Sequence, residues 1–219
     1  MEVSRTRLAE RADPKHTALI VVDMQNDFVH EKGAFQRFGF DISLVREAVP
    51  RVANVLKAAR NAGVLIIHTR MINDVDLNPP SWITFWGRDT PKMVTGEGSW
   101  GAKFFKGLEP RQGEIVLTKY TYGAFIGTNL ETILKNHGVK TVVVVGTGPN
   151  ICLGDTVHQA FALGYHVVVP KEGVAPFSKR DRDFTLKDKE VGLYIIENHY
   201  GVVCGIDDLI EVWSSFTAR

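Results

Sequence analysis

Cys152, Asp23 and Lys119 are the residues whose types and positions best suit them for chemistry. Cys152 follows the apolar run Val142–Gly146 and opens a predicted helix, where the helix dipole favours the reactive thiolate. Asp23 and Lys119 end two further apolar runs. In an open parallel sheet, chemistry gathers outside the carboxyl ends of the strands. The three residues therefore predict a thiolate nucleophile with an acid–base partner and a cation beside it.

The elements that must position these residues are apolar strands alternating with helices. Unbroken Val, Ile and Leu runs are typical of strands buried on both faces, so we predict an α/β fold: a doubly wound, mostly parallel sheet of about six strands with helices on both faces. Ser43 is the expected N-cap of the first helix and Thr128 that of the second. The predicted strands are Ala18–Val22, Val64–His68, Ile115–Thr118, Thr141–Val145, His166–Val169 and Gly201–Cys204, and the predicted helices are Leu44–Ala62, Asn129–Asn136, Cys152–Leu163, Asp183–Glu197 and Asp207–Trp213.

The composition is that of an ordinary globular protein. The chain has 219 residues, of which 44% are hydrophobic and 23% charged, and this predicts a single domain over residues 1–219. A formal net charge of +1 gives no global attraction to nucleic acid, and no apolar run is long enough to span a membrane. Two cysteines make no disulfide framework, and the charged N-terminus lacks a signal-peptide core. We expect a cytoplasmic protein with no nucleic-acid or membrane partner.

Three segments together resemble the isochorismatase-like cysteine hydrolases. They read ALIVVDMQNDF at 18–28, LTKYTYGAFIGTNLETIL at 117–134 and VVVVGTGPNICLGDTVHQAFALGY at 142–165. Taken singly, Asp23 is explained by a helix cap, Lys119 by a solvated strand end and Cys152 by a small buried side chain. Together and in order, the three favour catalysis. The resemblance is nearest to the biuret hydrolases, ureidoacrylate amidohydrolases and N-carbamoylsarcosine amidases.

This resemblance implies that Asp23, Lys119 and Cys152 form a catalytic triad. Cys152 would attack a carbonyl carbon to give a thioester, Asp23 would move the proton, and Lys119 would lower the thiol pKa. It also implies an oxyanion hole made by the backbone N–H groups of Gly148 and Cys152, beside a cis peptide bond. That bond could be Thr147–Gly148 or Gly148–Pro149, because proline adds a second cis candidate.

The expected activity is metal-independent hydrolysis of a C–N bond, with no cofactor. Nicotinamidases carry an Asp-x-His cluster with a further His after the second strand, and no second histidine lies near His68 here. The resemblance implies a small amide, ureido or carbamoyl substrate and a homodimer or homotetramer. Alternatives are a maleamate- or nicotinamide-like substrate, a catalytically silent binding protein on the same fold, and a nucleotide-binding domain suggested weakly by the turn Gly146-Thr147-Gly148.

Four residues are candidates for contacts with the substrate: Tyr122, Asn150, Arg70 and Trp100. Three of them also have a structural explanation: ordinary packing for Tyr122, a helix N-cap for Asn150 and a salt bridge for Arg70. The segment Met71–Leu108 has no strong period and contains three of the four tryptophans. A loop of this length inside a compact domain is usually functional, so we expect a binding loop that closes over the substrate.

Overall fold

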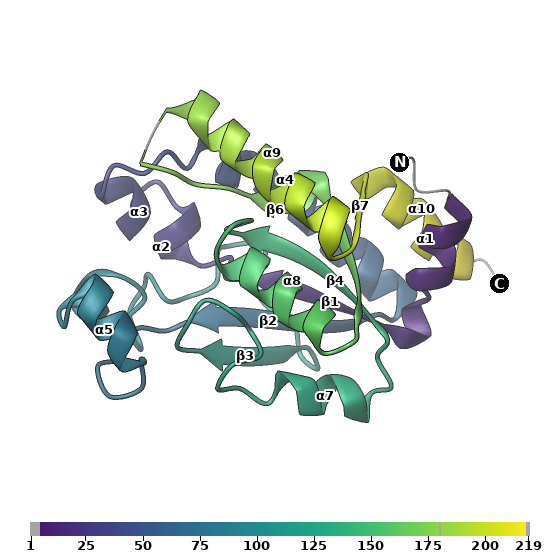
Figure 1. Cartoon of the computed structure of the whole chain (residues 1–219), viewed down its shortest axis with the longest axis horizontal. Helices are drawn as coiled ribbons and strands as arrows, with labels where there is room; N and C mark the ends of the chain where they lie inside the picture. The colour runs from purple at the N-terminus through teal and green to yellow at the C-terminus, as the bar shows by residue number, and fades with distance from the viewer. Residues whose placement is uncertain (1–4, 180, 218–219) are drawn as a thin grey trace.

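The protein is built around a parallel β-sheet, shown in Figure 1. The computed structural model describes residues 5–179 and 181–217. Within these ranges the strand order is β3-β2-β1-β4-β5-β7, and β6 pairs with β4 beside this path. All pairings between these strands are parallel. The strands are β1 (Thr17–Val22), β2 (Leu65–Met71), β3 (Ile115–Lys119), β4 (Thr141–Thr147), β5 (His166–Pro170), β6 (Val174–Ala175) and β7 (Val202–Cys204).

Helices cover both faces of the sheet, which confirms the predicted α/β fold. One apolar cluster joins the strands to α1, α4 and α10, and a second joins their other face to α7, α8 and α9. In Figure 1, α8 crosses in front of β4. No helix in the described part of the chain is both long and apolar enough to cross a membrane. The α-helices are α1 (Arg5–Arg11), α2 (Asn26–Val29), α3 (Ala34–Arg37), α4 (Ser43–Ala62), α5 (Pro80–Trp86), α6 (Thr90–Met93), α7 (Leu130–Asn136), α8 (Cys152–Ala162), α9 (Arg182–His199) and α10 (Ile206–Thr217).

Strand β1 shows why its sequence is apolar without a break. Leu19 and Val21 belong to the cluster beneath α4, whereas Ile20 and Val22 belong to the cluster beneath α8. Every residue of the strand is buried. Because both faces of a central parallel strand are covered by helices, each position has to be apolar or small.

The strand register brings the carboxyl ends of β1, β2 and β4 together. Val22, the last residue of β1, pairs with Thr69 on β2 and with Gly146 on β4. A Cβ atom on Gly146 would lie 2.2 Å from the Val22 carbonyl oxygen, so glycine is required for this close approach. Asp23 therefore leaves the sheet at an edge where two neighbouring strands also end.

Two predicted caps differ from the structure. Ser43 is the first residue of α4 rather than its N-cap, and its N–H donates to Asp41 Oδ1 at 2.9 Å. The N-cap position of α7 is Asn129. Thr128 Oγ1 nevertheless accepts the Leu130 N–H at 3.2 Å, which is the kind of hydrogen bond expected of an N-cap. In both places the polar side chain that accepts the helix N–H lies one residue earlier than the N-cap position.

Candidate active site

The structure brings together the three residues on which the sequence analysis centred. Lys119 ends β3, Asp23 follows β1 and Cys152 is the first residue of α8. Lys119 Nζ lies 2.7 Å from Asp23 Oδ2, and both side chains are 0% exposed. Cys152 is 7% exposed, and its thiol interacts with Lys119 and Asp23 through charge and through side-chain hydrogen bonds. Lys119 is therefore the partner of Asp23 Oδ2, although no group among the described residues donates a well-aligned hydrogen bond to this oxygen.

Thr69 fixes the orientation of Asp23. Its hydroxyl donates to Asp23 Oδ1 at 2.7 Å and accepts the Asp23 N–H at 3.2 Å. Asp23 also has a φ angle of 51°, in the left-handed region that aspartate enters more readily than most residues. Thr69 was not predicted as a site residue, because threonine is common in β-strands and its type gives no functional signal there.

Lys119 remains a cation in its buried position. Burial lowers the pKa of Lys119, but the negative charge of Asp23, with smaller contributions from Cys152 and from the hydrogen bonds to both residues, raises it by more, and the net direction is upward. Lys119 Nζ also donates to the carbonyl of Thr121 at 3.0 Å. A buried ammonium with a carboxylate and a carbonyl as partners is held in one place and in one charge state.

Cys152, the predicted nucleophile, is a thiol at neutral pH rather than the thiolate expected from the sequence. Burial raises the pKa of Cys152, Lys119 lowers it and Asp23 raises it, and the net direction is upward. Lys119 lowers this pKa as expected, but the net direction is opposite to the expected one, because desolvation of a buried thiolate exceeds the attraction of one cation that already has a carboxylate partner. Ionisation of the thiol therefore has to be coupled to proton transfer.

The turn before Cys152 also differs from the expectation. The described residues contain no cis peptide bond, and Gly148 instead reverses the chain with a φ angle of 73°, which glycine adopts without a Cβ clash. The Gly148 N–H donates to the carbonyl of Ala175 at 3.1 Å, so it does not face the cavity as a free oxyanion donor. Its carbonyl accepts the N–H of Leu153 at 2.9 Å. The Cys152 N–H has no backbone acceptor among the described residues.

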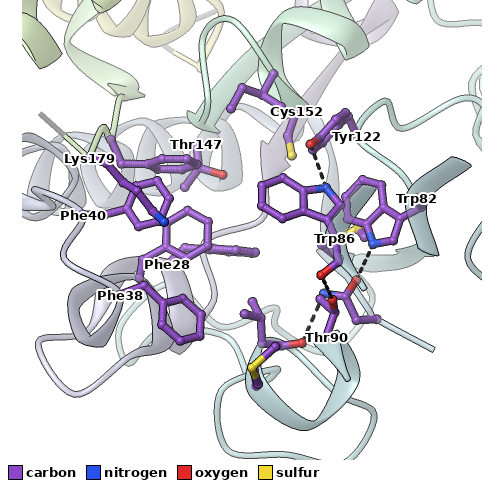
Figure 2. Close-up of a pocket in the computed structure, with 17 residues that line it drawn as sticks. Phe28, Phe38, Phe40, Trp82, Trp86, Thr90, Tyr122, Thr147, Cys152 and Lys179 are labelled. Atoms are coloured by element: carbon purple, nitrogen blue, oxygen red, sulfur yellow. Dashed lines mark hydrogen bonds between the residues drawn. The ribbon is translucent and has the colours of Figure 1, made fainter. Parts of the chain in front are cut away.

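A cavity of about 170 Å³ opens onto Cys152 (Figure 2). Figure 2 shows Trp82, Trp86 and Tyr122 on one side of it, with a group of phenylalanines on the other. The described lining residues are Phe28, Phe35, Phe38, Phe40, Met71, Asn73, Trp82, Trp86, Thr90, Met93, Val94, Tyr122, Thr147, Ile151, Cys152, Phe177 and Lys179.

The segment 71–108 supplies one wall of this cavity and is tied to the motif that begins at Asp23. Gln25 Nε2 donates to the carbonyls of Met71 and Ala102, both at 2.9 Å. Asp27 Oδ2 accepts the Thr95 N–H at 2.7 Å, and its Oδ1 accepts the Ala34 N–H at 2.9 Å. Two polar residues of one motif thus brace a long irregular segment that has little secondary structure of its own.

Of the four predicted substrate contacts, only Tyr122 lines the cavity. Its hydroxyl oxygen accepts the Trp86 Nε1–H at 3.1 Å, which leaves the hydroxyl proton available to a ligand. Asn150 donates to the Asp188 side chain and carbonyl, and Arg70 donates to Thr118. Trp100 is 46% exposed and lies edge-on to His30. Asn150, Arg70 and Trp100 therefore have structural partners outside the cavity.

His68 lies in a separate buried cluster. Its Nε2 is 2.9 Å from Glu114 Oε2, and Glu114 also pairs with Arg60 at 2.6 Å. Burial lowers the pKa of His68 more than Glu114 raises it, so the imidazole is neutral and donates to the carboxylate. Within the part of the chain that the structure describes, no three His, Cys, Asp or Glu side chains gather as a metal centre would require.

The fold and the similarity to known proteins place the chain among hydrolases built on a parallel α/β sheet. The isochorismatase domain matches residues 17–198, so the chain belongs to the isochorismatase family. The chain is also similar to the ureidoacrylate amidohydrolase RutB of Agrobacterium fabrum, with 29% identity over 92% of this chain and 91% of that protein.

Solved structures agree with this assignment. The N-carbamoylsarcosine amidase of Thermoplasma acidophilum has 27% sequence identity and a TM-score of 0.71, over 87% of this chain and 96% of that one. A cysteine hydrolase from Pseudomonas syringae pv. phaseolicola has a TM-score of 0.83 at 24% identity, over 93% and 94% of the two chains. The similarity to the cysteine hydrolase supports the fold alone. The similarity to the N-carbamoylsarcosine amidase supports the fold and links it to an enzyme named as an amidase.

Proposed function

We propose that this enzyme is a metal-independent cysteine amidohydrolase that cleaves a C–N bond of a small amide, ureido or carbamoyl compound. One observation supports the proposal: Cys152 lines a cavity, and its thiol interacts with the buried Asp23–Lys119 pair. The names of two relatives, a ureidoacrylate amidohydrolase and an N-carbamoylsarcosine amidase, support the bond type.

In the first half of the reaction, Cys152 forms a bond to the substrate. Its Sγ attacks the carbonyl carbon while the thiol proton passes to the carboxylate of Asp23, with which the thiol interacts. The C–N bond then breaks, and the departing nitrogen takes the proton from Asp23 and leaves as ammonia or an amine. Because the thiol is protonated at rest, this transfer and the attack belong to one step.

In the second half, water releases the acyl group. Asp23 takes a proton from a water molecule, whose oxygen attacks the thioester carbon. The C–S bond breaks, the sulfur recovers the proton from Asp23, and the acid product leaves. Lys119 keeps its proton throughout and stabilises each negative charge that develops at Asp23 or Cys152.

The developing oxyanion is assigned to the N–H of Cys152. This group lies at the N-terminus of α8, where backbone N–H groups have no helical acceptor. Tyr122, which lies beside Cys152 in Figure 2, offers a second donor through its hydroxyl proton. Gly148, the second expected donor, keeps its bond to Ala175. The predicted homodimer or homotetramer and the cytoplasmic location remain predictions.

The test is ammonia release over a panel of small amides, with paired cysteine variants. Cys152→Ala is expected to reduce kcat/KM by more than about a thousandfold, because the remaining residues cannot form a thioester. Cys204→Ala is the matched control, since Cys204 is also buried but lies in β7. Equal losses in both variants, or activity retained in Cys152→Ala, would refute the nucleophile. Because each step is carried by a named side chain, activity should survive dialysis against EDTA, and restoration by added metal would contradict this.

A further inference from the structure

We infer that the preferred substrates are primary amides whose acyl group is a single apolar aromatic ring. This rests on the proposed function and narrows its substrate class. The reaction is unchanged: the amide and one water give an aromatic acid and ammonia. What selects the ring is the part of the cavity beyond Cys152.

Eight of the 17 described lining residues are aromatic. On one side, the Phe35 ring centroid lies 4.6 Å from that of Phe177 and 4.8 Å from that of Phe28. On the other, the centroids of Trp82 and Tyr122 are 4.7 Å apart. Figure 2 shows the two groups facing one another across the cavity. Aromatic rings in offset or edge-on contact favour a further ring between them.

Apart from the Tyr122 hydroxyl proton and the Lys179 ammonium, the polar side-chain atoms of the described walls already have partners within the protein. Asn73 accepts from Trp82 Nε1 at 2.8 Å and donates to Thr95 Oγ1 at 3.0 Å. Thr90 Oγ1 donates to the carbonyl of Gly87 at 2.7 Å. A ligand in this part of the cavity therefore meets few groups that can replace the hydrogen bonds it made to water.

Charge on the walls points the same way. Among the described lining residues there is no carboxylate and no guanidinium, and the charged side chain other than the site itself is Lys179. Its Nζ lies 5.2 Å from the ring centroid of Phe40, so the ammonium is placed over an aromatic face. A second ureido group has N–H and C=O groups that need polar partners, and these walls do not supply them.

The volume of the cavity suits one ring. At about 170 Å³ it is close to the roughly 150 Å³ of an apolar protein cavity that binds benzene. A polar atom buried there without a partner should reduce kcat/KM by roughly tenfold to a hundredfold relative to an apolar analogue of the same shape. Nicotinamide differs from benzamide in this way, by one ring nitrogen.

The experiment compares kcat/KM for ammonia release from benzamide, phenylacetamide, nicotinamide and biuret. The better of the two carbocyclic amides is expected to exceed nicotinamide and biuret by at least about tenfold. Preference for biuret or nicotinamide would overturn the aromatic assignment while leaving the amidohydrolase proposal intact. Hydrolysis of none of a wider panel of amide and ureido compounds would instead overturn the proposed function, so the two failures are distinguishable.

A wall variant tests the same point within one protein. Phe38 lines the cavity and is 40% exposed, so Phe38→Asn should fold normally. It is expected to lower kcat/KM for the carbocyclic amide about fivefold to tenfold while that for biuret stays constant or rises. Phe161→Asn is the matched control, because Phe161 is 49% exposed on α8 and lies outside the cavity lining. Equal effects of Phe38→Asn on both substrates would contradict the inference, and a melting curve for each variant checks folding.

Discussion

Thr69 holds Asp23 from two sides, since its hydroxyl donates to Oδ1 at 2.7 Å while accepting the Asp23 N–H at 3.2 Å. The other carboxylate oxygen, Oδ2, faces Lys119 at 2.7 Å. One oxygen is therefore used for orientation and the other is left for proton transfer. This division lets a residue with a left-handed backbone keep a single side-chain position at the centre of the site.

Replacement of Thr69 should therefore slow the chemistry without preventing binding. Thr69→Val keeps the shape but removes the hydroxyl, and loss of a hydrogen bond to a buried carboxylate costs about 1.5–3 kcal/mol. We expect kcat to fall by roughly tenfold to a hundredfold, with KM changing much less. Thr69→Ser restores the hydroxyl and should recover most of the activity. Equal losses in the two variants would show that packing, and not the hydrogen bond, is what Thr69 supplies.

The protonated resting state of Cys152 can be read from its alkylation. Because burial raises the pKa of this thiol, its rate of reaction with iodoacetamide should still be rising between about pH 7 and pH 9, with no plateau near neutrality. Lys119→Met removes the cation that lowers this pKa, so alkylation should be slower at each pH. The rates are measured in the Cys204→Ala background, which leaves one thiol. A plateau near pH 7, or an unchanged profile in Lys119→Met, would disprove this account of the electrostatics.

Asp27 should matter for the shape of the cavity rather than for the reaction. Asn has one carbonyl oxygen, so in Asp27→Asn either the Ala34 or the Thr95 N–H loses its acceptor. We expect a loss of about 1–3 kcal/mol in the free energy of unfolding and a rise in KM larger than the fall in kcat. Faster proteolytic cleavage near residues 95–101 would show directly that the segment is released. Asp76→Asn, on the exposed part of the same segment, is the control and should change none of these.

The Glu114 cluster should make the protein sensitive to acid. Burial raises the pKa of Glu114, but hydrogen bonds from Arg60, the Arg111 N–H and His68 lower it to about 2, below its ordinary value of 4.5. A carboxyl whose folded pKa is lowered stabilises the fold above its unfolded pKa and loses that contribution as the pH falls from 4.5 toward 2. The pKa of His68 is also lowered in the folded protein, from its ordinary value of 6.5. His68 therefore adds to the loss of stability as the pH falls below 6.5.

Urea unfolding at several pH values checks this. Glu114→Gln should be less stable than the natural protein near pH 7 by about 1–3 kcal/mol, because charge-assisted hydrogen bonds are lost. The difference should shrink as the pH falls from 4.5 toward 2, since the unfolded natural protein then takes up a proton at Glu114 that the folded protein does not bind, and the stabilisation is lost. Glu109→Gln is the control, as Glu109 lies nearby and its carboxylate accepts from the exposed Gly107 N–H. A difference independent of pH would argue against the ionised Glu114.

The fold could be predicted from the sequence because its signals are local. Central parallel strands must be apolar at every position, and the helices between them carry a 3.6-residue period, so six strands were found within a few residues of their ends. The two-residue strand β6 and the four-residue helices α2, α3 and α6 were missed, because a segment that short has no period. The seven-residue helices α1 and α5 were missed as well.

The site was predictable only in part. The positions of Asp23, Lys119 and Cys152 follow from strand ends, which the sequence shows. The protonation state of Cys152 depends on burial, which comes from packing, and the wall formed by Phe28, Phe35 and Phe177 joins segments about 140 residues apart in the chain. Such a wall has no signature in any one stretch of sequence.

The placement of the tryptophans gives this enzyme two separate optical signals. Trp82 and Trp86 line the cavity beside Cys152, whereas Trp213 is a fully buried residue of α10 in the cluster with α4, and its Nε1–H donates to the carbonyl of Ala12 at 3.0 Å. Occupation of the cavity changes the solvent around the first two, and only unfolding changes the surroundings of Trp213. With Trp100, the fourth tryptophan, replaced by Phe throughout, intrinsic emission would follow unfolding in a Trp82→Phe, Trp86→Phe protein, and it would follow ligand binding in Trp213→Phe.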